Sequence, residues 1–141
     1  MSAAQLAALA RTTEPNTMLR RFLALDAVVT GANAVAYLAA SGPLGRLLGV
    51  GPGLLLGLGA FLAVFAAGAG LLAARPRPAA LPVRAVVEAN LAWSALSLLA
   101  LAVWLSPTTA GTVWTVLQAG TVAGFAALQY AALRGREGKT S

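Results

Sequence analysis

Two carboxylates lie inside long apolar stretches of this chain, where charged side chains are rare. Asp26 follows Arg21 by five residues, and Glu88 follows Arg84 by four residues. Ionisable groups within a membrane-spanning helix commonly bind ions, relay protons or hold a solute. Desolvation favours the neutral form of such a carboxylate, whereas a nearby arginine favours its charged form. Such a group can therefore exchange a proton or bind a cation. Asp26 and Glu88 are therefore the candidate charge carriers.

The polar neighbours of Asp26 in the same apolar stretch are Thr30, Asn33 and Tyr37. An α-helix advances about 100° per residue, so these four residues fall within about 60° of one another. Polar groups facing lipid lose their hydration without gaining a partner. The stripe therefore predicts that this face of the helix points toward other helices.

Two later apolar stretches carry further polar residues. Asn90, Ser94 and Ser97 share one helical face, whereas Glu88 lies about 160° from Asn90, so Glu88 and Asn90 cannot both point into one narrow seam. In the last stretch, Gln129 returns close to the helical angle of Gln118.

The depth of these residues predicts two layers. Asp26 lies ~8 Å beyond Arg21 and Glu88 ~6 Å beyond Arg84 along their helices, and we expect one cluster of Asp26, Arg84, Glu88 and Gln129. Asn33, Ser94, Ser97 and Gln118 would form a middle layer, and the residues expected to line a ligand route are Asn33, Asn90, Gln118 and Tyr37. The alternative is that these groups only hold helices together, at ~0.6 kcal/mol per bond.

Composition places these residues in a membrane. The chain has 141 residues, of which 59% are hydrophobic and 10% charged, against about 25% charged in soluble domains. Four apolar segments are long enough to span a bilayer: roughly 22–41, 53–74, 83–105 and 109–133. We expect an all-α, antiparallel four-helix transmembrane bundle over 19–134. Residues 1–18 would form a tail or short surface helix, and 135–141 a second tail.

Basic residues predict the orientation, because they are enriched in cytoplasmic loops. Nine of the ten flank one side, and only Arg46 lies on the other. The nine are Arg11, Arg20, Arg21, Arg75, Arg77, Arg84, Arg134, Arg136 and Lys139. Both termini should therefore be cytoplasmic. The preference for arginine over lysine, with many Ala, Leu and Gly residues, indicates a GC-rich bacterium, and hence its inner membrane.

Several classes of function are disfavoured. The chain has no Cys and no His, which removes thiol nucleophiles and the usual zinc and haem ligands. No spacing of the remaining residues indicates catalysis, so we expect neither an enzyme, a metal nor a cofactor. The net charge of +6 is spread beside apolar segments rather than in a basic run, so nucleic acid is not an expected partner.

The second apolar segment lacks polar side chains between Gly53 and Ala74 and is rich in Gly and Ala. Small residues let membrane helices approach closely, so this segment could bind a membrane protein or a second copy of the chain. The chain also reads as two helical hairpins, whose second helices end similarly in "FAAGAGLLAARPR" and "FAALQYAALRGR". A parallel repeat would place a site between the hairpins.

The runs "LRRFLALDAVVTGANAVAYLAASGPLG" and "FAALQYAALR" resemble uncharacterised small four-span integral membrane proteins of high-GC Gram-positive bacteria. The resemblance extends from Leu19 to Arg134 and implies the architecture without any chemistry. Two functions remain open. The leading expectation is an accessory, structural or partner-binding subunit. The alternative is a small-molecule or ion transporter or binding protein that uses Asp26 and Glu88 as buried carboxylates.

Overall fold

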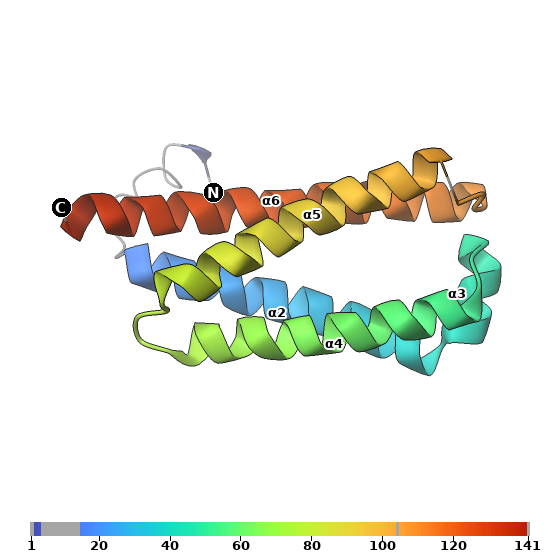
Figure 1. Cartoon of the computed structure of the whole chain (residues 1–141), viewed down its shortest axis with the longest axis horizontal. Helices are drawn as coiled ribbons and strands as arrows, with labels where there is room; N and C mark the ends of the chain where they lie inside the picture. The colour runs from blue at the N-terminus through green and yellow to red at the C-terminus, as the bar shows by residue number, and fades with distance from the viewer. Residues whose placement is uncertain (1, 4–14, 104, 141) are drawn as a thin grey trace.

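The computed structural model describes residues 2–3, 15–103 and 105–140, with the side chains of 15 and 137–140 left out. Within these residues the chain is helical and has no strand, which confirms the predicted all-α class. The five helices, shown in Figure 1, are α2 (Pro15–Ala39), α3 (Ser41–Leu48), α4 (Pro52–Ala74), α5 (Ala80–Val103) and α6 (Thr109–Thr140).

Four of these helices are long and apolar enough to cross a bilayer, so the protein is a multi-pass membrane protein in a lipid environment. The candidate spans are Asn16–Ala39, Pro52–Ala74, Ala80–Val103 and Thr109–Arg136. Large apolar side chains cover the outside of the bundle. Val64, Leu71 and Val103, for example, are each more than 70% exposed. A bilayer accommodates such a surface because lipid tails are as apolar as these side chains.

The helix ends differ from the predicted ones in three places. The first long helix begins at Pro15 rather than near residue 22, and α3 occupies a stretch predicted as a connection. Gly49 ends α3 with φ 73°, a conformation that glycine adopts without strain, and Pro52 opens α4. At the other terminus, α6 continues to Thr140 through most of the expected tail. The surface helix expected within 1–18 falls almost entirely outside the described residues.

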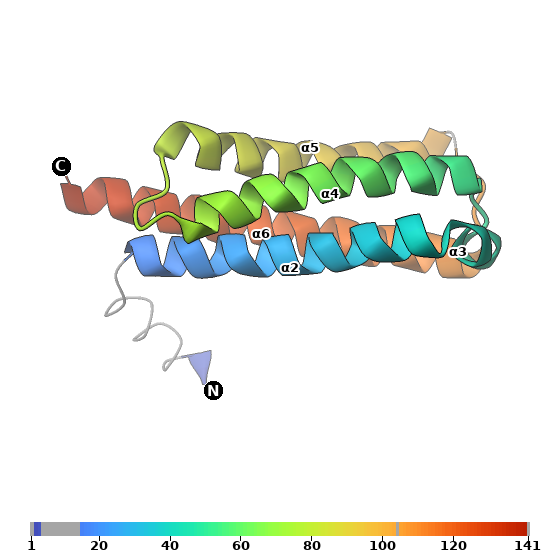
Figure 2. The ribbon, with the colours of Figure 1, turned by 90° about the horizontal axis from the view of Figure 1, so that it is seen from below.

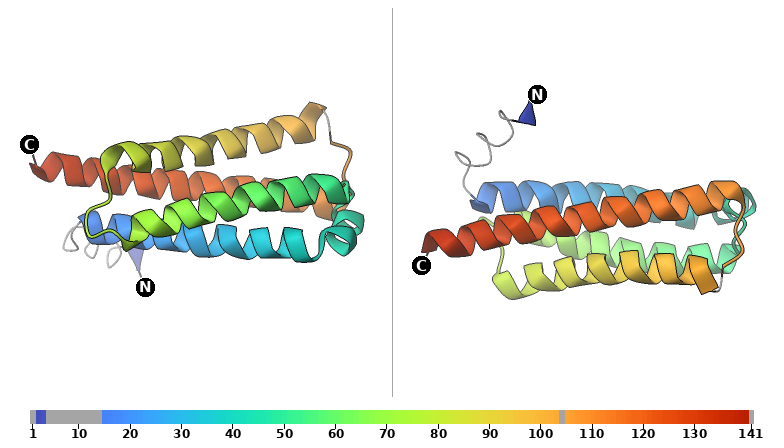
Figure 3. Two further views of the ribbon diagram at one scale, coloured as in Figure 1. Left: turned by 60° about the horizontal axis from the view of Figure 1, so that its bottom comes forward. Right: turned by 90° about the horizontal axis from the view of Figure 1, so that it is seen from above.

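The long helices pack as two hairpins. The α2 and α4 helices form one pair, α5 and α6 form the other, and the pairs are joined mainly along α2 and α6. By contrast, α4 and α5 hardly touch, and Figure 1 shows them diverging from the loop that connects them. Figure 3 shows α2 and α6 side by side. The bundle is therefore tightly packed on three sides and loosely closed on the fourth.

The α2–α4 pair approaches closely at Gly59. A Cβ atom there would lie 2.9 Å from Cγ of Leu38 and 3.1 Å from Cβ of Tyr37, closer than carbon atoms normally pack. Beside this point lies one apolar core cluster, made of Ala34, Tyr37, Leu55 and Leu62. A second cluster, toward the chain termini, is made of Leu19, Leu23, Val83, Val86 and Leu133.

Both ends of the bundle are tied together by hydrogen bonds. At the end that carries the termini, the guanidinium of Arg136 donates to the carbonyl of Pro78 and to the Asn16 side chain, and Arg20 donates to the carbonyl of Ala73. At the opposite end, which Figure 2 shows beside α3, the Thr108 hydroxyl donates to the Leu47 carbonyl at 2.7 Å. The bonds of Arg136 and Thr108 join the two hairpins, whereas the bond of Arg20 joins α2 to α4 within one hairpin.

Candidate ligand-binding site

The polar residues of α2, α5 and α6 meet in a buried cluster around Asp26. The carboxylate is fully buried and accepts three hydrogen bonds. Thr30 Oγ1 donates to Oδ1 at 3.0 Å, while Asn90 Nδ2 and Gln129 Nε2 both donate to Oδ2 at 2.8 Å. Asn90 Nδ2 also lies 3.1 Å from Gln129 Oε1. We call Asp26, Thr30, Asn90 and Gln129 the Asp26 cluster.

The hydrogen bonds define how the amides of the Asp26 cluster are oriented. A carboxylate in its ionised form only accepts hydrogen bonds, so each amide must present nitrogen to it. Turning either amide around would place its oxygen against a carboxylate oxygen. Within the described residues, none of the interactions of Asp26 is with an arginine or a lysine. Among the described residues, three hydrogen-bond donors and no cation therefore stabilise the carboxylate.

Two predicted members of this cluster lie elsewhere. The expectation that Glu88 and Arg84 join Asp26 is wrong, since both side chains are exposed. The reason is the geometry of α5, on which Glu88 and Asn90 point in nearly opposite directions. The neutral amide turns inward because it can complete hydrogen bonds with both Asp26 and Gln129, and a second carboxylate there would face the first. The notion of two buried carboxylates therefore fails for Glu88.

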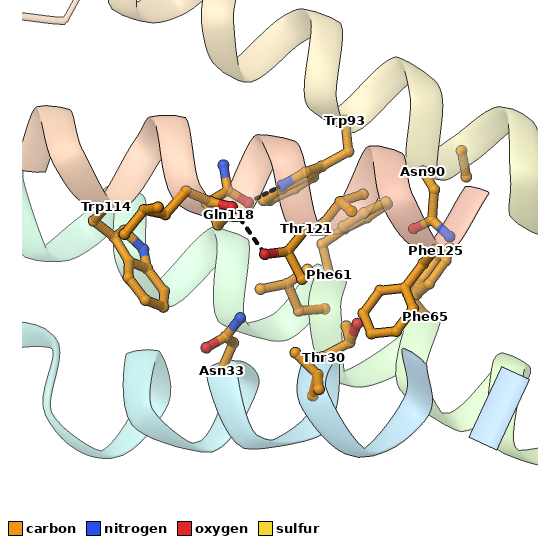
Figure 4. A pocket seen from close by; sticks show the side chains of 15 residues that line it. Thr30, Asn33, Phe61, Phe65, Asn90, Trp93, Trp114, Gln118, Thr121 and Phe125 are labelled. Carbon is orange, nitrogen blue, oxygen red and sulfur yellow. Dashed lines mark hydrogen bonds between the residues drawn. The ribbon is translucent and has the colours of Figure 1, made fainter. Parts of the chain in front are cut away.

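A cavity of about 260 Å³ adjoins the Asp26 cluster. All four long helices line it, and Thr30 and Asn90 belong both to its wall and to the cluster. Its aromatic side chains are Phe61, Phe65, Trp93, Trp114 and Phe125, and its further polar side chains are Asn33, Gln118 and Thr121. Figure 4 shows these side chains converging from opposite sides. No lining residue carries a charge.

A second cavity of about 250 Å³ continues toward the α3 end of the bundle. Trp93, Trp114 and Gln118 line both spaces and form the partition between them. The partition is held by two bonds: Trp93 Nε1 donates to Gln118 Oε1, and Trp114 Nε1 donates to the Tyr37 hydroxyl, each at 2.7 Å. Tyr37 and Ser97 also line the second cavity.

The residues expected to form a middle layer have two different roles: some join helices, and others line the cavity. Ser94 donates to the carbonyl of Ala119 at 2.8 Å and so joins α5 to α6. Gln118 holds Trp93, as described above. Asn33 lines the cavity, and its side chain has no hydrogen-bond partner among the described residues. The inward stripe predicted on the first helix is confirmed, because Asp26, Thr30 and Tyr37 are buried and Asn33 is half-buried.

One aromatic pair bridges α4 and α5 beside the cavity. The rings of Phe61 and Trp93 stack with their centroids 5.8 Å apart and their planes within 2°. Phe61 is 53% exposed and lines the cavity, so its ring lies at the edge of the cavity on the α4–α5 side. Apart from this pair, α4 and α5 make few contacts along the described chain.

Sequence reasoning missed the aromatic residues of the cavity. Phe61 and Phe65 lie in the segment expected to bind a membrane protein or a second copy of the chain, and the sequence pattern gives no sign that Trp93 and Trp114 line a cavity. The available signal was that Phe65 and Phe125 open the two similar runs of α4 and α6, and both line the cavity.

Within the described residues, no three His, Cys, Asp or Glu side chains group closely enough to hold a metal ion. No protein-family model, curated protein or solved structure matches this chain.

Proposed function

We propose that this protein binds a small amphipathic molecule inside the membrane. The observation that carries the proposal is the cavity itself, about 260 Å³ between all four helices, with aromatic rings and amides on the same wall. Ligand sites combine an apolar lining with a few polar groups that orient the ligand. A cavity of about 150 Å³ suffices for benzene, so this one accommodates a ligand with one or two rings.

The α4–α5 seam is the route by which such a ligand would arrive. The helices on the other three sides pack closely, whereas on this side α4 and α5 make few contacts and are bridged by the Phe61–Trp93 stack. Rotation of the exposed Phe61 side chain would widen the passage from the acyl chains to the cavity. A ligand dissolved in the bilayer could then enter without passing the tied ends of the bundle.

Occupancy can be measured through the cavity tryptophans. A Trp104→Phe background leaves Trp93 and Trp114 as the two tryptophans, and the protein is placed in lipid nanodiscs. Naphthalene-sized ligands, neutral and charged, are titrated while tryptophan emission is recorded. We expect saturable binding of at least one ligand.

Two phenylalanine substitutions on α6 make this test specific. Val122→Phe fills the cavity and should abolish saturable binding, because Val122 lines it. Val116→Phe adds the same ring on an exposed position outside the cavity and should leave binding intact. The proposal fails if no ligand saturates, or if Val122→Phe binds as the parent does.

A specific feature of α4 favours a second function, the docking of a membrane partner or a second copy of the chain. Added Cβ atoms at Gly53, Gly57 and Gly68 would meet nothing within 4 Å, and Ala63 is exposed. The three glycines lie within about 60° of one another on α4, and small residues on a helix surface let another helix approach closely. Gly57→Leu and Ala63→Leu should then release a co-purified partner or shift the oligomer seen by crosslinking. An unchanged set of partners and oligomers argues against this function.

A further inference from the structure

The polar atoms nearest the Asp26 cluster present lone pairs to the cavity. Asn90 directs its nitrogen to Asp26 and Gln129, which leaves its oxygen on the cavity side, as Figure 4 shows. The Thr30 hydroxyl donates its hydrogen to Asp26, and the Thr121 hydroxyl donates to the Leu117 carbonyl at 2.9 Å. A hydroxyl that has donated its only hydrogen can still accept. This wall therefore favours a ligand that donates hydrogen bonds or carries positive charge.

The carboxylate of Asp26, which lies behind this wall, also favours a cationic ligand. Asp26 is fully buried, and the residues that hold it, Thr30 and Asn90, are also cavity walls. The described residues supply the carboxylate with donors and with no cation. Inside a bundle the effective dielectric is low, so a negative charge acts across one layer of side chains. Its field attracts a cation in the cavity and repels an anion.

The aromatic side chains that line the cavity also favour a cationic ligand. Phe61, Phe65, Trp93, Trp114 and Phe125 surround the space, and the faces of aromatic rings attract cations, more strongly when water is excluded. The lining contains no lysine or arginine that would compete for these faces or for Asp26. Acceptors, buried charge and rings therefore all favour the same ligand charge.

We propose that the cavity binds a monovalent organic cation, an ammonium group attached to an apolar body of one or two rings. This inference rests on the proposed ligand-binding function and names its ligand class. The cavity lies near the middle of each long helix, for example at Thr30 and Asn33 of α2 and at Phe61 of α4. That depth suits a free lipophilic cation better than the ammonium of a lipid headgroup, which stays at the bilayer surface.

The test compares three probes of similar size in the nanodisc assay with the Trp104→Phe background. Benzyltrimethylammonium is the cation, neopentylbenzene is its neutral counterpart of the same shape, and benzylsulfonate is an anion. Binding to the cavity is the part of the signal that Val122→Phe removes, which corrects for partition into lipid. We expect the cation to bind at least about tenfold more tightly than the neutral probe, and the anion not to bind.

Two matched pairs of variants test which residues cause the preference for a cation. Asp26→Asn and Glu88→Gln each remove one negative charge, inside the bundle and on its surface respectively, so only Asp26→Asn should reduce cation affinity, by roughly tenfold or more. Should Asp26→Asn fail to fold, Asn33→Lys and Asn33→Met serve instead. The tethered ammonium of Asn33→Lys should block the cation, while Asn33→Met, similar in length and uncharged, should still bind it.

The outcomes separate the two proposals. If no probe shows binding that Val122→Phe removes, the ligand-binding function itself fails. If the neutral probe or the anion binds as tightly as the cation, or the cation binds equally to Asn33→Lys and Asn33→Met, the cavity is a ligand site but the cation inference is wrong. Repeating the titration in nanodiscs of phosphatidylcholine and of digalactosyldiacylglycerol, a neutral lipid without an ammonium group, identifies the source. Equal affinity supports a free cation, and weaker binding in phosphatidylcholine supports the same ammonium chemistry supplied by a lipid.

Discussion

Asn90 Nδ2 lies 2.8 Å from Asp26 Oδ2, a contact between α5 and α2 across 64 residues of sequence. These two helices belong to different hairpins and are not among the closely packed pairs of the bundle. The bond therefore crosses the diagonal of the bundle, and Gln129 of α6 closes the same cluster from a third helix. One carboxylate thus holds both hairpins together.

Removal of this carboxylate should destabilise the whole bundle. Asp26→Ala leaves the Asn90 and Gln129 amides without their buried acceptor, and we expect a loss of about 3 kcal/mol in the free energy of unfolding. The measurement is an unfolding titration with sodium dodecyl sulfate in mixed micelles. Glu88→Ala is the control, because Glu88 is exposed, and it should change stability little. Equal losses for the two variants would show that Asp26 is not a structural centre.

Two serines on α5 should differ although they lie one helical turn apart. Ser94 donates to the Ala119 carbonyl, so Ser94→Ala should lower the free energy of unfolding by ~0.6 kcal/mol. Ser97 lines the second cavity without a hydrogen bond among the described residues, and Ser97→Ala should have no measurable effect. The same unfolding titration compares them. A larger loss for Ser97→Ala would contradict this assignment.

Two glycines on α4 should respond oppositely to a single methyl group. Gly59→Ala forces α2 and α4 apart at Leu38 and Tyr37 and should cost about 1–3 kcal/mol, as overpacked cores do. Gly57→Ala meets open space and should be neutral or slightly stabilising, because alanine favours helix. Thermal unfolding in detergent, measured as the loss of the monodisperse peak, ranks the stability of the two variants. The prediction fails if Gly57→Ala is the more harmful change.

Arg136 should matter for stability as well as for topology. Its guanidinium is buried and reaches Pro78 and Asn16, so Arg136→Gln should cost about 1–3 kcal/mol. Hydrogen exchange should also rise at the start of α2 and in the α4–α5 connection. Arg77→Gln removes the same charge from an exposed site in that connection and serves as the control. If both variants exchange alike, the tie seen at Arg136 does not hold this end.

The proposed orientation can be tested because the chain has no cysteine. Ala79→Cys and Ser106→Cys place single thiols at exposed positions at opposite ends of the bundle. If both termini are cytoplasmic, a membrane-impermeant maleimide should label Ser106→Cys in intact cells and Ala79→Cys only after lysis. The reverse labelling pattern would invert the topology and show that the arginine bias misleads here.

The sequence by itself determined that the chain crosses a membrane as a bundle of four helices, because length and hydropathy are properties of each segment alone. It also determined which face of the first helix points inward, since the spacing of Asp26, Thr30 and Tyr37 fixes their common angle on any α-helix. The burial of these three side chains confirms that reasoning. Local periodicity was sufficient because no partner had to be known.

Only the tertiary structure decided which polar groups meet and where space remains. Glu88 and Asn90 compete for the inside of α5, and the choice depends on what α2 and α6 present there: a carboxylate, Asp26, that needs donors. The cavity has the same origin. Phe61 lies in a segment without a polar stripe, so nothing in its own neighbourhood predicts that its ring stacks on Trp93. The loose α4–α5 contact, set by the packing of the other three helix pairs, makes that position part of a site.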